Sequence, residues 1–147
     1  MIAGSVLVDK INEITAYPQS GELTQIVNLE KAAGGCVPNV ALDLKKICPD
    51  LEVQAIGKIG NDEEGKYVSN VLRRGGVDIC GLTVMEEERT SFTEVMSVIN
   101  GQRTFFTYAG ASADFGYADI AFEKINPKIF HLGYLLLLKK VDEGEGV

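Results

Sequence analysis

The feature that most constrains the fold is a helix pattern with a clear start and end, placed between two apolar segments. Asp62 is a good N-cap, two acidic residues follow it in the first turn, and Gly75 ends the pattern after two arginines. Residues 53–59 before it and 77–84 after it are mostly apolar and predict strands. A strand, a helix and a strand in this order favour parallel strands, so we predict a parallel sheet covered by helices.

The same alternation continues along the rest of the chain. Further elements are expected as a strand at 2–8, a helix at 39–47, a short helix at about 118–125 and a strand at 128–132. Alternating segments at about 11–29 and 92–108, the second containing the turn signal Asn100–Gly101, predict a small antiparallel β lid. Residues 1–147 are therefore interpreted as part of a single α/β domain, with the lid strands inserted.

Composition excludes several classes of function. The 14 basic and 21 acidic residues give a net charge of −7, and the basic residues are scattered, which argues against nucleic acid and anionic membranes as partners. The apolar run at 129–138 is too short to span a bilayer. Three cysteines without C-x-x-C spacing predict neither disulfides nor a zinc site. With no signal peptide pattern, a cytoplasmic location is expected.

Two loops rich in small residues are candidate binding elements. Gly34 and Gly35 precede a helix, so backbone N–H groups can approach a ligand there, and Asn39 offers donors and an acceptor to a hydroxyl-bearing molecule. The alternative is an ordinary loop with Asn39 as N-cap. Residues 108–114 form the second loop, whose alternative is a plain turn.

Single polar residues give weaker signals. Asp9 directly follows the first strand, where open α/β folds bind ligands, although a solvated acid is the commoner case. His131 is interpreted as a core or strand-end residue, and Cys36 as a small loop residue. Residues 60–67 have P-loop spacing, but Tyr67 stands where Ser or Thr is needed, so a capped helix start is favoured.

Taken in order, these features resemble the N-terminal part of the PfkB (ribokinase-like) carbohydrate kinase family. The resemblance covers nearly the whole chain, and no single motif decides it. The matching positions are Gly4-Ser5 with Asp9, Ala33-Gly34-Gly35 to Asn39, Ile59 to Gly65, Gly75 to Asp78, Thr90, Gly101 to Thr104, and Ala109-Gly110-Ala111.

The resemblance implies a ribokinase-like, Rossmann-type parallel sheet with helices on both faces, plus the lid. Asp9, Gly34, Gly35 and Asn39 are then expected to bind the sugar, and Gly110 and Ala111 to close over it. No metal ligand or catalytic residue is expected in this segment. The catalytic base, the ATP site and Mg²⁺ are implied for the C-terminal half, beyond Val147, so this segment alone is expected to bind no cofactor and to be inactive. The lid also implies a possible homodimer.

The implied function is an ATP-dependent kinase that transfers the γ-phosphoryl group of ATP to a sugar hydroxyl. Cys36 stands where sugar-phosphate kinases of the family often have Lys, which favours a neutral sugar or a nucleoside. A nucleoside kinase and a non-catalytic sugar-binding or oligomerisation module remain the alternatives.

Overall fold

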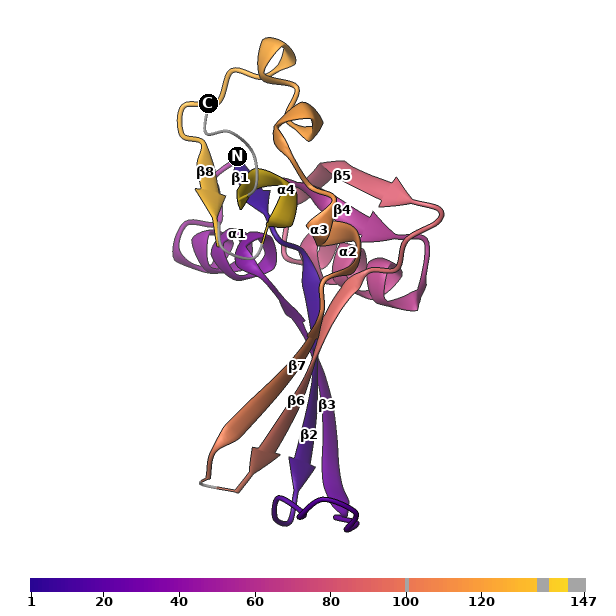
Figure 1. The fold of residues 1–147 in the computed structure, drawn as a ribbon. Helices are drawn as coiled ribbons and strands as arrows, with labels where there is room; N and C mark the ends of the chain where they lie inside the picture. The colour runs from indigo at the N-terminus through magenta and orange to yellow at the C-terminus, as the bar shows by residue number, and fades with distance from the viewer. Residues whose placement is uncertain (100, 135–137, 143–147) are drawn as a thin grey trace.

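The structure is a computed structural model that describes residues 1–99, 101–134 and 138–142. Two four-stranded sheets organise the chain (Figure 1). The strands are β1 (Ile2–Gly4), β2 (Leu7–Ile14), β3 (Ile26–Gly34), β4 (Gln54–Gly60), β5 (Asp78–Met85), β6 (Ser91–Val98), β7 (Arg103–Tyr108) and β8 (His131–Gly133). The helices are α1 (Cys36–Ile47), α2 (Glu63–Arg74), α3 (Gly110–Ala113) and α4 (Lys139–Asp142), with 3₁₀ turns at Tyr117–Asp119 and Phe122–Lys124.

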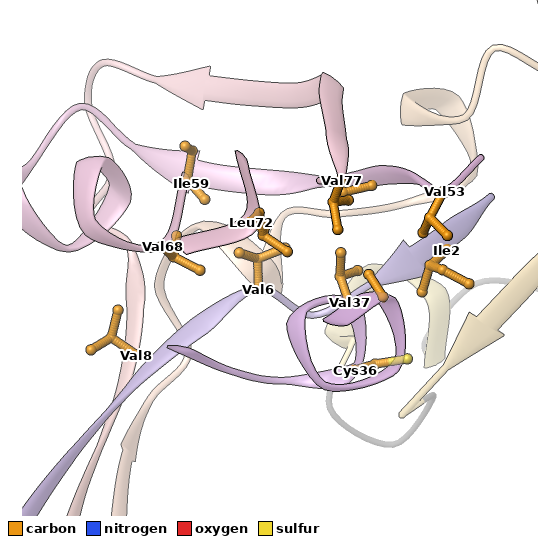
Figure 2. Close-up of a cluster of buried hydrophobic side chains, with 12 residues drawn as sticks. Ile2, Val6, Val8, Cys36, Val37, Val53, Ile59, Val68, Leu72 and Val77 are labelled. Atoms are coloured by element: carbon orange, nitrogen blue, oxygen red, sulfur yellow. The ribbon is translucent and has the colours of Figure 1, made fainter. Parts of the chain in front are cut away.

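The first sheet has the order β5-β4-β1-β8 and all its pairs are parallel, which confirms the predicted parallel sheet. Helices α1 and α2 cover one face, where Val6, Val37, Val68 and Leu72 are fully buried (Figure 2). Among the described residues, the opposite face packs against Phe115, Ile120 and Leu138, which lie next to short helices and 3₁₀ turns. The expectation of helices on both faces therefore holds in full only for the α1–α2 side of the described residues.

The central strand–helix–strand unit was predicted closely. Helix α2 begins after Asp62, whose carboxylate accepts a hydrogen bond from the N–H of Gly65 at 2.8 Å, and it ends at Gly75. Its first turn contains Glu63 and Glu64, as the charge pattern indicated. None of the helices in the described part of the chain combines the length and the apolar character that crossing a bilayer needs.

The second sheet, with the order β3-β2-β6-β7, is the lid, and it extends away from the parallel sheet (Figure 1). The prediction of an antiparallel lid was wrong at its centre, because β2 and β6 pair in parallel from Leu7↔Ser91 to Ile14↔Val98. Each of these two strands leaves the domain in the same direction and returns through its own hairpin, so only the outer pairs are antiparallel. The lid also begins at Leu7, earlier than residue 11.

Three other expectations were wrong in detail. The run at 2–8 is divided between two sheets, because the chain turns at Ser5–Val6. Residues 118–125 form two 3₁₀ turns rather than a helix. The strand expected at 128–132 is limited to β8. In the apolar run at 129–138, Ile129 is 76% exposed, and residues 135–137 lie outside the described residues.

Candidate functional site

The bend at Ser5–Val6, between the two sheets, is the point where the candidate binding loops meet. The Ser5 hydroxyl accepts a hydrogen bond from the N–H of Cys36 at 3.0 Å, at the start of α1. On its other side, the Ser112 hydroxyl accepts from the N–H of Val6 at 3.2 Å and donates to the Val6 carbonyl at 3.1 Å. The bend is therefore held between α1 and α3, and all these groups are buried.

The double glycine packs directly against this bend. Gly35 has a φ of +87°, and a Cβ at this position would lie 2.6 Å from the Ser5 carbonyl oxygen. Gly35 is the N-cap of α1, so Asn39 is not the cap. Helix α1 starts three residues earlier than expected, because the Ser5 hydroxyl and carbonyl accept hydrogen bonds from its first N–H groups.

Asp9 and Gly34 lie together. The Asp9 carboxylate lies over the α-carbon of Gly34, where any Cβ would overlap its Oδ2 atom. Asp9 is half-buried, and burial raises its pKa. No hydrogen bond or positive charge from the described residues offsets this effect on the pKa. By contrast, the neighbouring Lys10 is paired with Glu64 at 3.0 Å. Asp9 is thus a carboxylate whose oxygens are free to accept hydrogen bonds from a ligand.

A groove of about 380 Å³ lies beside the bend, between the root of the lid and the short helices α3 and α4. Hydroxyl groups line it together with apolar and charged side chains. The lining residues are Ser5, Leu7, Ser91, Thr107, Tyr108, Ala109, Ser112, Ala113, Lys139 and Asp142. The five hydroxyl groups of these residues already make hydrogen bonds within the chain, so toward a ligand the groove offers mainly apolar surface together with the charges of Lys139 and Asp142.

The second small-residue loop forms one wall of the groove. Gly110 has a φ of +47°, and a Cβ on it would lie 2.5 Å from the Arg89 carbonyl oxygen. The N–H of Ala111 donates to the same oxygen at 2.8 Å, and Ala111 is fully buried. The segment expected to be a loop is thus a short helix, α3, after a tightly packed turn.

None of the six residues predicted as sugar-binding lines the groove. Gly35 contacts Ser5, Gly110 and Ala111 lie between Ala109 and Ser112, and Asn39 has an exposed side chain on α1. The structure therefore brings Asp9, Gly34 and Gly35 together, places Gly110 and Ala111 across the bend, and leaves Asn39 further along the helix.

Known proteins match almost the whole chain. The model of the "pfkB family carbohydrate kinase" matches residues 3–142. The chain belongs to this family. A fructokinase-2 from Oryza sativa subsp. japonica is 30% identical over 138 residues, which are 92% of this chain but 39% of that protein. The chain thus spans about two fifths of the length of the curated relatives it matches.

Solved structures agree with membership of the pfkB family. The fructokinase from Halothermothrix orenii is 27% identical, with a TM-score of 0.71 over 89% of this chain and 45% of that one. The ribokinase from Arabidopsis thaliana, solved in complex with ribose and ATP, is 25% identical, with a TM-score of 0.66 over 76% of this chain and 36% of that one.

In this pfkB family chain, most of the residues that line the groove were not predicted from the sequence. Ser5 belongs to the Gly4-Ser5 match to the family, and Ser112 lies in the candidate binding loop at 108–114. The sequence therefore pointed to both residues. Ser91 is the first residue of β6 and pairs with Leu7, whereas Thr107 of β7 pairs with Thr93 of β6. Only the pairing of the lid strands brings Ser91 and Thr107 to the groove. Nothing in the sequence pointed to Lys139 and Asp142.

The two remaining candidates lie side by side but are not a catalytic pair. Cys36 is fully buried and burial raises the pKa of its thiol, which opposes formation of a nucleophilic thiolate. His131 is exposed and is the first residue of β8, which fits the strand-end interpretation and not the core one. Both side chains contact Gly133. The described residues contain no disulfide and no group of three potential metal ligands.

Proposed function

We propose that the protein carrying this chain is an ATP-dependent sugar kinase, with a neutral sugar such as fructose as acceptor. The observation that carries the proposal is the Asp9 carboxylate, half-buried over Gly34 without a partner among the described residues. Curated relatives called fructokinases support a neutral ketose as the first sugar to test.

In this proposal the chain supplies the sugar site and the lid. Asp9 accepts hydrogen bonds from two sugar hydroxyls, which fixes the orientation of the acceptor. Gly34 and Gly35 allow close approach of the backbone, and Asn39 contributes from α1. Gly110 and Ala111 form the turn that lies next to the bound sugar.

ATP and Mg²⁺ are proposed to bind residues outside this segment. Phosphoryl transfer depends mainly on positioning and on charge stabilisation. The described residues hold no group of three carboxylate, His or Cys side chains that fits a metal ion. In this proposal the segment positions the acceptor hydroxyl, and the catalytic base lies outside it. The exposed free thiols Cys48 and Cys80 support a reducing, cytoplasmic location.

A coupled ADP-release assay of the full-length protein tests this function. We expect ADP formation that depends on fructose or another neutral sugar. Turnover with nucleosides instead would support the nucleoside kinase alternative, in which Tyr108 of the groove stacks on the base. Sugar binding without ADP release would support a non-catalytic module. If neither sugars nor nucleosides bind, the proposed function is wrong.

We also propose that the lid pairs with the lid of a second copy. Phe105 is 60% exposed and pairs with Val95, which in turn lies beside Ile11. These three residues lie on the lid face that carries Asp9, but further from the parallel sheet. Phe105 is the exposed one of the three, since Ile11 is half-buried and Val95 is only 5% exposed, so Phe105 is the apolar side chain that this face offers to another protein surface.

Replacing Phe105 with Asp is expected to weaken this dimer about tenfold or more, because an interfacial aromatic residue would become a desolvated charge. Analytical ultracentrifugation measures the effect. Leu23→Asp is the control, since Leu23 is 92% exposed in the segment between β2 and β3. A wild-type monomer at all concentrations would contradict the proposal.

A further inference from the structure

The turn between β4 and α2 caps the helix and also makes hydrogen bonds to Thr90. Asp62 caps α2 through Gly65, but its carboxylate also accepts two hydrogen bonds from Thr90, far away in the sequence. The N–H of Thr90 donates to Oδ2 at 2.9 Å, and its hydroxyl donates to Oδ1 at 2.6 Å. Two of the three hydrogen bonds that the Asp62 carboxylate accepts therefore come from the residue before β6 and not from the helix.

Thr90 is the residue immediately before β6, and it is fully buried. Its hydroxyl also accepts a hydrogen bond from the N–H of Gly60 at 2.8 Å. A Cβ on Gly60 would lie 2.6 Å from the Thr90 nitrogen, and a Cβ on Gly65 would lie 2.9 Å from the Thr90 hydroxyl. Because these two glycines have no side chain, the root of the lid (residues 89–91) can pack directly against the turn between β4 and α2.

The other side of the lid root is tied to the end of β7. The Arg89 carbonyl oxygen accepts from the N–H of Ala111, and the Ser91 hydroxyl donates to the Ala109 carbonyl oxygen. The N–H of Ser112 donates to the Ser91 hydroxyl at 3.0 Å. Residues 89–91 are thus held between the β4–α2 turn and the wall of the groove.

The protonation state of Asp62 follows from its hydrogen bonds and its neighbours. Burial works to raise its pKa, but the hydrogen bonds from Thr90 and Gly65 and the charge of Arg89 outweigh burial and hold the pKa below its usual value. Asp62 is therefore ionised at neutral pH, and its hydrogen bonds are charge-assisted. Glu64 of the same helix start also contacts the lid, since it pairs with Lys10 of β2 at 3.0 Å.

We propose that Asp62 is a positioning residue that fixes the root of the β6–β7 hairpin, and with it the lid residues that line the groove. Asp62 is not among the residues that line the groove, so it acts through Thr90. Ser91 follows Thr90 directly, and Thr107 and Tyr108 lie on the strand paired with β6. The consequence for sugar affinity rests on the proposed function, whereas the consequence for lid order does not.

Asp62→Ser separates this role from helix capping. Serine is also a good N-cap, so the bond to Gly65 can be kept, but its shorter side chain cannot hold Thr90 as well. Hydrogen–deuterium exchange of the full-length protein should then show amides of β6 and β7 exchanging about tenfold faster or more, because charge-assisted hydrogen bonds are lost at the root. Amides of α2 should keep their wild-type rates.

Matched variants control this experiment. Asp78→Ser removes a carboxylate that also accepts a backbone hydrogen bond, from Cys80, but at the start of β5, and it should leave lid exchange unchanged. Thr90→Ser keeps both donors to Asp62 and should behave as wild type, whereas Thr90→Val should mimic Asp62→Ser. This pair keeps the test decisive if Asp62→Ser fails to fold.

The KM for the sugar is measured on the same variants and is expected to rise about tenfold in Asp62→Ser. If exchange in Asp62→Ser accelerates equally in α2 and in the lid, Asp62 acts only as a helix cap and the proposal is wrong. Lid exchange at the wild-type rate would also overturn the proposal. Failure of the wild-type protein to use any sugar would contradict the proposed function alone, because the exchange rates would still decide the role of Asp62.

Discussion

Asp9→Asn is expected to weaken sugar binding about 10- to 100-fold, because charge-assisted hydrogen bonds to the sugar are replaced by weaker neutral ones. The substitution keeps the shape of the side chain over Gly34. Isothermal calorimetry with the sugar that the full-length protein phosphorylates measures the change in affinity.

The stability of the same variant should be unchanged or higher. Burial raises the pKa of Asp9, so the charged form is disfavoured in the folded chain. A carboxyl group whose pKa is raised on folding lowers stability as the pH rises from the unfolded to the folded pKa. At neutral pH this penalty is fully present, and Asn removes it.

Asp43→Asn is the matched control for Asp9→Asn. Asp43 is an exposed residue of α1 that pairs with Lys46 on the surface at 3.1 Å. Its replacement should change neither sugar affinity nor thermal stability appreciably. Wild-type affinity in Asp9→Asn, or equal losses in both variants, would contradict the assignment of Asp9 to the sugar site.

Gly35→Ala is expected to destabilise the chain by about 2 kcal/mol or more. Alanine is strained at the φ of +87°, and its Cβ would press against the backbone of Ser5, which cannot move without disturbing the bend. Because the bend joins the two sheets, sugar binding should be lost together with stability. Chemical denaturation gives the free energy of unfolding.

The chain offers a matched control for the backbone strain. Gly21 has a φ of +86°, but no atom lies within 4 Å of the position of its Cβ. Gly21→Ala should therefore show the cost of the positive φ alone, which is clearly smaller. Equal destabilisation in the two variants would mean that the contact with Ser5 contributes nothing.

The sequence predicted those parts of the fold whose signals are local. Asp62 and Gly75 mark the two ends of α2, and the apolar pattern of residues 53–59 gave β4, because capping and burial act within a few residues. The hairpin of β6 and β7 was also predicted from its turn signal. The family resemblance assigned Asp9 and the double glycine to one sugar site, and the structure brings Asp9 and Gly34 together.

The remaining features depend on contacts between distant segments. The parallel pairing of β2 with β6 has no local signal, since both strands alternate as antiparallel strands do. The division of residues 2–8 follows from the hydrogen bonds of Ser5 and Ser112 with partners far along the chain. The groove forms only once these segments are assembled, so its residues could not be predicted as a set.

A crystal structure of the full-length protein with the sugar that it phosphorylates tests the central claim most directly. The sugar is expected beside the Ser5–Val6 bend, with two of its hydroxyl oxygens about 3 Å or less from the Asp9 carboxylate. A sugar bound elsewhere, with Asp9 still without a hydrogen-bond partner, would contradict the account.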